Sequence, residues 1–190
     1  MSKSGLVVVI TAPSGSGKTT IYRELLKRRP DISFSVSYTT RQRRVGETDG
    51  VDYFFISREA FERKIERGDF IEWAEVHKDL KGTDRRHLEE CLSRSSVCIL
   101  DVDVQGAVSI MNAFPEALTI YISPPSMEEL RKRLEKRGTE SESAVRIRLH
   151  NAEKELEYQD RFQYIVVNDR VEKAVKSIEK IIDTELQKRR

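Results

Sequence analysis

The chain has 190 residues, of which 38% are hydrophobic and 35% are charged. That length suits one well-buried domain with small inserts, and the composition excludes a disordered chain. The 34 basic and 32 acidic residues give a formal net charge of +2, so we expect no general attraction to nucleic acid or to membranes, and any anion site must be built locally.

Neither a membrane span nor a zinc site is expected. No apolar stretch approaches the ~20 residues that cross a bilayer. The apolar run at residues 6–11 is too short for the core of a signal peptide, so a cytoplasmic location is expected. Cys91 and Cys98 are expected to be small core residues, because neither has a partner at metal-ligand spacing.

Continuous apolar runs predict four buried strands of a parallel sheet, at residues 6–11, 97–102, 118–122 and 164–167. Helical patterns are found at about 19–29, 126–137, 143–158 and 171–188. Pro30 ends the first of these helices. Ser126 and Glu129 form a capping box at the start of the second.

Residues 34–76 have a different pattern. Segments 34–38 and 70–76 alternate between apolar and polar residues, and 53–56 is a short aromatic run. Alternation predicts half-exposed antiparallel strands. The sequence therefore predicts an α/β core that is interrupted by a small mixed insert and then by a charged helical pair over residues 126–158.

A glycine-rich segment between the first strand and the first helix is typical of a Walker A loop. Its backbone N–H groups, together with the positive end of the following helix, suit a polyphosphate. In such a loop Lys18 bridges the β- and γ-phosphates of ATP, and the Thr19 hydroxyl ligates Mg²⁺. The candidate ATP-binding residues are Ala12, Pro13, Ser14, Gly15, Ser16, Gly17, Lys18, Thr19 and Thr20.

Ala12 stands where the Walker A pattern normally has glycine, and the alternative interpretation is an incidental glycine-serine turn. Asp101 and Asp103 end the apolar run 97–102, and ligands bind at the carboxyl ends of such strands. We assign Asp101 to the outer sphere of the metal and Asp103 to the phosphate acceptor. An aspartate at this position is otherwise often a turn residue or a helix cap.

Segments in the same order over residues 5–183 resemble guanylate kinases. They read SYTTRQRRVGE at 37–47, DGVDYFF at 49–55, FIEWAEVH at 70–77, GT at 82–83, ILDVDVQG at 99–106, PPS at 124–126, RGTE at 137–140 and VVND at 166–169. The resemblance implies an α/β P-loop nucleoside monophosphate kinase fold, in which helices flank a parallel sheet. It also implies the reversible reaction ATP + GMP ⇌ ADP + GDP, with dGMP as a further acceptor.

The resemblance implies one domain over 1–190. Its core would be about 4–35, 92–124 and 160–190, its mixed α/β GMP-binding insert about 36–91, and its helical lid about 125–159. The implied partners are ATP with Mg²⁺ and GMP, in a monomer or small homo-oligomer that binds neither nucleic acid nor membrane.

The resemblance also implies roles for single residues. Those on the GMP phosphate are Ser37, Arg41, Arg44 and Tyr53, and those on guanine are Glu72, Thr83 and Asp103. Asn168 would lie near the donor's adenine. The catalytic charges would be Lys18, Arg41, Arg137 and Arg148.

Chemistry supports these assignments. An ionised Glu72 can accept from both N1–H and the N2 amine of guanine, whereas adenine offers no such pair, and a site of this kind discriminates by about 10⁴ or more. The guanidinium forks of Arg41 and Arg44 suit bidentate phosphate contacts. Taken singly, Glu72 also fits an exposed strand position, and each arginine fits solvated surface.

The triplet Lys81-Gly82-Thr83 departs from the Tyr-Gly-Thr or Tyr-Gly-Ser that is usual in this family. A lysine there is compatible with gripping the phosphate, extending into solvent or shifting the acceptor preference. Our hypothesis is retained GMP activity with somewhat weaker acceptor binding. Three other functions stay open: a kinase of the same fold acting on another phosphorylated acceptor such as a sugar phosphate, a non-catalytic phosphopeptide-binding module, and a nucleic-acid-binding protein.

Overall fold

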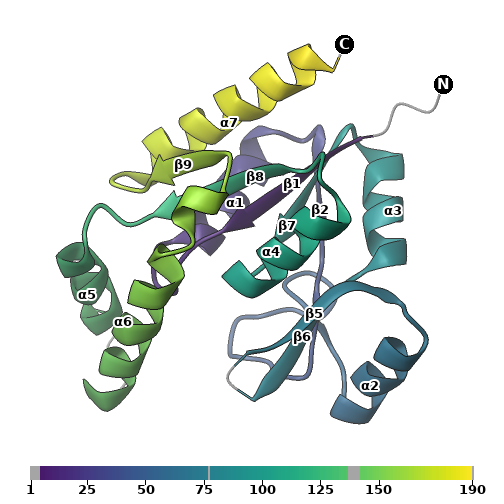
Figure 1. Cartoon of the computed structure of the whole chain (residues 1–190), viewed down its shortest axis with the longest axis horizontal. Coiled ribbons are helices and arrows are strands. Elements are labelled where there is room, and N and C mark those ends of the chain that lie inside the picture. Colours follow the sequence, from purple (N-terminus) through teal and green to yellow (C-terminus); the bar gives the residue numbers. More distant parts are fainter. Residues whose placement is uncertain (1–4, 77, 137–141, 190) are drawn as a thin grey trace. The chain divides into compact units, whose positions relative to one another are not determined.

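The computed structural model describes residues 5–76, 78–136 and 142–189 (Figure 1). The chain divides into two compact units. The first comprises the residues up to Val9 together with Asp31–Ala117, and the second comprises Ile10–Pro30 together with the residues from Leu118 onward.

The elements alternate between strand and helix along most of the chain. The strands are β1 Leu6–Thr11, β2 Ile32–Ser35, β3 Tyr38–Thr39, β4 Phe54–Phe55, β5 Phe70–Val76, β6 Asp79–Asp84, β7 Val97–Asp101, β8 Leu118–Ser123 and β9 Tyr164–Val167. The helices are α1 Lys18–Arg28, α2 Arg58–Glu66, α3 Arg85–Arg94, α4 Val104–Ala113, α5 Met127–Lys136, α6 Glu142–Leu156 and α7 Val171–Lys188, with a 3₁₀ turn at Gln159–Arg161.

The first unit carries two sets of strands. Strands β2, β7 and β1 lie in that order, and β2 runs parallel to β7 with Ile32 opposite Val97. Strands β4, β3, β6 and β5 form a second, mixed sheet. Phe61, Phe70 and Leu80 are buried together between α2 and this sheet. The predicted α/β core with a small mixed insert is confirmed.

The prediction of one antiparallel strand at 34–38 was wrong. Ser35 ends β2, which pairs in parallel, whereas Tyr38 begins β3 of the second sheet. The alternation was misleading because its polar positions are small and buried. Ser35 is 2% exposed and Ser37 is 3% exposed, so these hydroxyls do not mark a solvent face.

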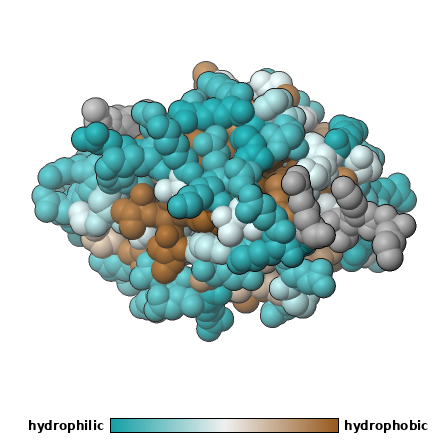
Figure 2. Space-filling model, turned by 90° about the horizontal axis from the view of Figure 1, so that it is seen from above, coloured by the Kyte–Doolittle hydropathy of each residue, from teal (hydrophilic) through white to brown (hydrophobic). Residues whose placement is uncertain are grey.

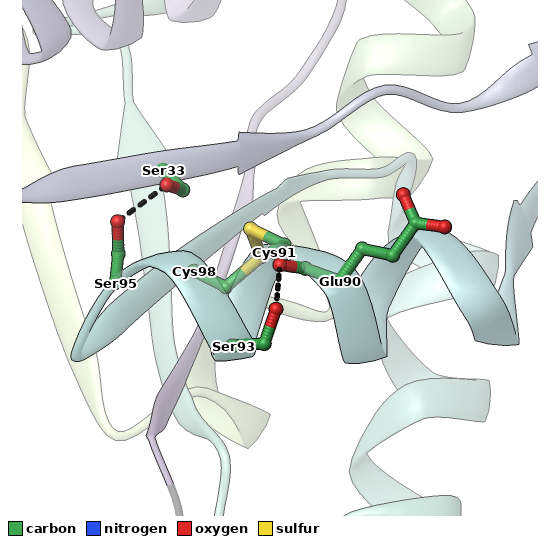
Figure 3. The surroundings of a disulfide bond; sticks show 6 residues. All are labelled: Ser33, Glu90, Cys91, Ser93, Ser95 and Cys98. Atoms are coloured by element: carbon green, nitrogen blue, oxygen red, sulfur yellow. Dashed lines mark hydrogen bonds between the residues drawn. A yellow bond between two sulfur atoms is a disulfide. The ribbon is translucent and has the colours of Figure 1, made fainter.

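A disulfide joins α3 to β7 in the first unit (Figure 3). Cys91 and Cys98 are buried, as the sequence predicts, but they are bonded to each other with their Cα atoms 5.8 Å apart. Close by, the Ser33 and Ser95 hydroxyls share a hydrogen bond that links β2 to the residue after α3.

In the second unit, β8 runs parallel to β9 with Ile120 opposite Tyr164, and α1 packs against α7. Helix α7, drawn in yellow in Figure 1, has the predicted bounds Val171–Lys188. Helices α5 and α6 pack through Leu130, Leu134, Val145, Leu149 and Ala152. The Glu129 N–H donates to the Ser126 hydroxyl at 3.1 Å, which confirms the predicted cap of α5.

The face shown in Figure 2 is mostly hydrophilic, with hydrophobic side chains confined to small areas. This matches the charged share of the sequence, 35%. Across the helices that the structure describes, none combines the length and the apolar character that crossing a bilayer requires.

Candidate functional site

The phosphate loop connects β1, which ends at Thr11, to α1, which begins at Lys18. Gly15 and Gly17 have φ of +91° and +86°, a region that side chains other than glycine rarely adopt. Gly17 is the N-cap of α1 and no side chain caps that helix end. The first turn therefore presents backbone N–H groups and the positive end of the helix dipole, an arrangement suited to an anion.

The side chain of Asn168 is hydrogen-bonded to the phosphate loop. Its Nδ2 donates to the Ser16 carbonyl oxygen at 2.7 Å, and the residue is 3% exposed. A Cβ atom added to Gly17 would lie 2.6 Å from this Nδ2, so only glycine fits there without a shift. The guanidinium of Arg133 donates in turn to the Asn168 carbonyl oxygen at 3.0 Å.

Helix α6 also contacts the loop. Arg148 donates from Nε and Nη2 to the Ser14 hydroxyl at 3.2 and 2.8 Å. The Ser14 N–H donates to Oε2 of Glu155 at 3.2 Å. The predicted catalytic Arg148 is thus at the phosphate loop, whereas the predicted Arg137 lies outside the described residues.

A pocket of about 410 Å³ lies beside the loop. It is lined by Gly15, Gly17, Thr20, Arg133, Asn168, Asp169 and Val171. Its size and its position next to the candidate phosphate loop suit the nucleoside part of a donor nucleotide.

A second group of predicted residues lies in the first unit, on β5 and β6. Glu72 is 7% exposed, and its Oε1 accepts a hydrogen bond from the Thr83 hydroxyl at 2.7 Å. Burial raises the pKa of Glu72 above the ordinary glutamate value, the Thr83 hydrogen bond lowers it, and the nearby charge of Asp103 raises it. A Cβ atom added to Gly106 would lie 2.7 Å from the other oxygen of Glu72, so this glycine lets α4 approach the carboxylate.

Asp103 is the N-cap of α4. Its Oδ1 accepts from the Gly106 N–H at 2.8 Å, which confirms the helix-cap alternative for that oxygen. Asp101, two residues earlier, ends β7 and is 6% exposed.

The predicted phosphate-binding arginine Arg41 is paired within its own loop. Its Nη2 lies 2.8 Å from Oε1 of Glu47, and its guanidinium is 5.5 Å from the centre of the Tyr53 ring. The other oxygen of Glu47 accepts from the Arg44 N–H at 2.8 Å. Burial alone would raise the pKa of Glu47, but Arg41 and the Arg44 N–H lower it below the ordinary value.

Lys81 is directed toward the same aromatic ring from β6. Its Nζ lies 5.1 Å from the centre of the Tyr53 ring and donates to the Asp101 carbonyl oxygen at 3.2 Å. The side chain does not extend freely into solvent, one of the three possibilities that the sequence left open. Burial opposes its charge, but Tyr53, Asp101, Asp103 and Glu72 together raise the pKa of Lys81 above the ordinary lysine value.

The structure therefore brings the predicted residues together in two groups. In the second unit, the phosphate loop contacts Asn168 and Arg148. In the first unit, Glu72 contacts Thr83, and Arg41 contacts Tyr53. Ser37 is buried and the Arg44 side chain is exposed. Sequence reasoning gave no role to Glu47, Glu155 or Arg133, although Glu47 lies within the segment that resembles guanylate kinases.

Comparison with known proteins identifies the family. The guanylate kinase family model matches residues 4–185. A guanylate kinase of Thermotoga maritima is 48% identical over 97% of this chain and 89% of its own length. A guanylate kinase of Caldanaerobacter subterraneus is 45% identical over 97% of this chain and 90% of its own length.

Solved structures agree. The crystal structure of guanylate kinase from Anaplasma phagocytophilum matches with a TM-score of 0.80 and 33% identity, over 97% of this chain and 88% of that chain. A shikimate kinase from Bacteroides thetaiotaomicron matches with a TM-score of 0.52 and 18% identity, which shows only a shared fold. The chain belongs to the guanylate kinase family.

Proposed function

We propose that this protein transfers the γ-phosphate of ATP to GMP, giving ADP and GDP. A phosphate oxygen of GMP attacks the γ-phosphorus of ATP, and the bond from that phosphorus to the bridging oxygen breaks as ADP leaves. The observation that carries the choice of acceptor is the buried Glu72 carboxylate, held by Thr83 on β5 and β6.

This carboxylate favours guanine over adenine. Guanine has two adjacent donors, N1–H and the N2 amine, which match an ionised carboxylate. Adenine lacks this pair and would leave a buried charge without partners, which is the costly case. Thr83 occupies Oε1 of Glu72 through one lone pair, so both oxygens keep acceptor capacity toward a base.

Phosphate binding is assigned to both units. On the donor side we propose the residues from Ala12 to Thr20, with Lys18 on the β- and γ-phosphates and Asn168 near the donor's nucleoside. On the acceptor side we propose Ser37, Arg41, Arg44 and Tyr53. Arg148 and Arg137 would add positive charge around the transferring group, since phosphoryl transfer depends on alignment and charge neutralisation.

Magnesium fits the oxygen donors that this chain offers. Among the described residues no cluster of three or more His, Cys, Asp and Glu could hold a metal alone, and Mg²⁺ in kinases is held by the nucleotide phosphates with one or two protein oxygens. The Thr19 hydroxyl and the buried Asp101 carboxylate are our candidates. The bound ion would neutralise charge on the phosphates.

We also propose that the protein works in the cytoplasm. Its two substrates are free nucleotides, and the proposal requires no membrane contact.

A coupled assay that follows ADP formation tests the function directly. ATP is supplied with GMP, dGMP, AMP, IMP and a sugar phosphate in separate reactions. We expect turnover with GMP far above that with AMP or the sugar phosphate, and a Lys18→Ala variant with kcat lower by orders of magnitude. Equal turnover with AMP, or near-normal turnover of the Lys18 variant, would contradict the proposal.

A further inference from the structure

Two side chains of helix α6 contact the same residue of the phosphate loop. Arg148 donates from Nε and Nη2 to the Ser14 hydroxyl at 3.2 and 2.8 Å, and Oε2 of Glu155 accepts from the Ser14 N–H at 3.2 Å. Arg148 and Glu155 are seven positions apart, which is about two turns of an α-helix, so they lie on one face of α6. Ser14 is thus held by a guanidinium and a carboxylate from the same helix face.

The Glu155 end of this face is fixed to β8. The Glu155 carbonyl oxygen accepts from the hydroxyl of Tyr121, a fully buried residue of β8, at 3.0 Å, and from the Tyr158 N–H at 3.2 Å. Helix α6 ends at Leu156, so this carbonyl is among those that a helix end leaves without an intrahelical partner. Tyr121 satisfies it, and the position of Glu155 is therefore set by the sheet.

A carboxylate beside a phosphate loop opposes the ligand that the loop is proposed to bind. The negative charge of Glu155 repels a polyphosphate, so a direct contact with ATP does not account for it. It instead supplies the acceptor that orients Ser14, on whose hydroxyl the Arg148 guanidinium rests. A guanidinium binds an anionic phosphate oxygen more strongly than a neutral hydroxyl, so Arg148 can pass from Ser14 to the γ-phosphate when ATP is bound.

We propose that Glu155 is a positioning residue for phosphoryl transfer. By fixing Ser14 against α6 it holds Arg148 at the phosphate loop, where the arginine's charge is needed in the transition state. In this role Glu155 touches neither substrate and acts only through Ser14 and Arg148. The inference rests on the proposed function, because it requires a γ-phosphate beside the loop.

A purely structural role for Glu155 predicts different measurements. If its hydrogen bond only keeps the loop ordered, its loss weakens ATP binding and slows transfer whether or not Arg148 is present. If it positions Arg148, its loss slows transfer while ATP affinity stays at least equal to that of the parent, since a repelling charge is removed. The loss then has no further effect once Arg148 is gone, because the two residues act as a unit.

The experiment is a double-mutant cycle on the full chain with Glu155→Ala, Arg148→Ala and the double variant. Rapid quench under single-turnover conditions, with ATP, Mg²⁺ and saturating GMP, measures the rate of phosphoryl transfer, and calorimetry with ATP measures donor affinity. We expect Glu155→Ala to transfer about tenfold or more slowly than the parent, and to change nothing in the Arg148→Ala background.

Two further variants sharpen the result. Glu155→Gln keeps an acceptor oxygen for the Ser14 N–H and should restore most of the transfer rate. Glu153→Ala, at an exposed position of the same helix, is the matched control and should transfer phosphate like the parent.

The inference is overturned if Glu155→Ala transfers phosphate at the parent's rate, if it loses ATP affinity, or if the two single effects multiply in the double variant. A Glu155→Gln variant as slow as Glu155→Ala also overturns it. Should Glu155→Ala fold poorly, Glu155→Asp, which is one methylene shorter, takes its place in the cycle, and a rate equal to the parent's again overturns the inference.

Failure of the proposed function looks different. The unmodified protein would then transfer phosphate to another acceptor at least as fast as to GMP, and the cycle run with that acceptor still decides the role of Glu155. A parent that prefers GMP, with Glu155 variants that are equally fast, overturns the role of Glu155 alone.

Discussion

The amide of Asn168 and the carbonyl of Ser16 are joined by a hydrogen bond of 2.7 Å, although 152 positions of the chain separate them. The Ser16 carbonyl oxygen, in a residue that is 1% exposed, is therefore satisfied by a side chain from outside the loop. Asn168 follows β9 and accepts, at its own carbonyl, a hydrogen bond from Arg133 of α5. The candidate phosphate loop is thus held by the residue that follows β9.

Replacing Asn168 by alanine should loosen this loop. The buried Ser16 carbonyl would lose its partner, which costs about 1–3 kcal/mol of unfolding free energy. Because the loop must be ordered to bind a polyphosphate, the affinity for ATP should fall as well. Chemical denaturation and ATP calorimetry measure the two effects. Asn112→Ala, on the exposed face of α4, is the control and should change neither. Unaltered ATP affinity in Asn168→Ala would show that the loop does not need this support.

Gly17→Ala should damage the site more than a positive φ alone explains. The added Cβ would lie 2.6 Å from Asn168 Nδ2, in addition to the strain of a left-handed backbone, about 1–2 kcal/mol. Gly68→Ala is the matched control, because Gly68 has φ of +69° with no atom within 4 Å of the added Cβ. We expect both variants to be less stable, but only Gly17→Ala to lose ATP affinity. Equal ATP affinity in the two variants would rule out this contact.

The sequence predicts best the elements whose residues are buried on both faces or arranged along one helix stripe. The run at 6–11 is β1, buried at every position, and α7 has its predicted bounds. The run at 164–167 is β9 with its predicted bounds, but Ile165 and Val167 are exposed, so the prediction of a buried strand was wrong there. The phosphate loop was equally predictable from the sequence, because local backbone geometry requires its glycines.

Elements that depend on their neighbours were missed or misassigned. Strand β6 reads DLKGTD, a polar segment that resembles a turn, and it is a strand because it pairs with both β5 and β3. Helices α2 and α4 were not predicted, although Ser57 caps the start of α2. The aspartate before α4 was assigned to a ligand, although Asp103 also caps that helix.

In the candidate site, the identity of residues was predictable but their pairing was not. The sequence indicates that Arg41 and Glu72 are available for binding, yet it does not show that Glu47 pairs with Arg41 or that Thr83 donates to Glu72. These partners come from different positions of a loop or from neighbouring strands. Such pairs depend on strand register and loop conformation, which a pattern of residue types does not encode.

Glu72→Gln should reduce guanine affinity, since a glutamine amide presents at most one acceptor to the two guanine donors. We expect GMP and guanosine to bind about tenfold or more weakly. Glu75→Gln, at an exposed position of the same strand, is the control. Equal guanosine affinity of the parent and Glu72→Gln would remove Glu72 from the site.

The pH dependence of guanosine binding should report the same carboxyl. The pKa of Glu72 is raised, so protonation begins at a higher pH than for an ordinary glutamate and removes the charge that guanine needs. Guanosine affinity should therefore fall as the pH decreases through this raised pKa. The pH dependence of folding stability, measured without ligand, has the opposite sign to that of guanosine affinity. The folded state binds the proton more tightly than the unfolded state does, so this group's contribution to stability falls as the pH rises between the two values. Guanosine is the probe because it lacks the phosphate, whose second pKa is near 6. A flat profile in Glu72→Gln and a sloping one in the parent is the expected result, and identical profiles would contradict it.

Reduction of the disulfide should destabilise the first unit without changing the site chemistry. Cys91 and Cys98 are seven positions apart and connect α3 to β7, so the bond closes a short loop in the unfolded chain. For a loop of that size the loss is about 2–3 kcal/mol of unfolding free energy. Denaturation of the parent with and without a thiol reductant measures it, and a Cys91→Ala/Cys98→Ala double variant, which should be insensitive to reductant, is the control.

Neither cysteine lies among the residues proposed to bind nucleotide, so GMP affinity well below the denaturation midpoint should be the same in both redox states. A parent whose unfolding curve does not respond to complete reduction would show that packing around α3, rather than the covalent bond, holds this helix to β7.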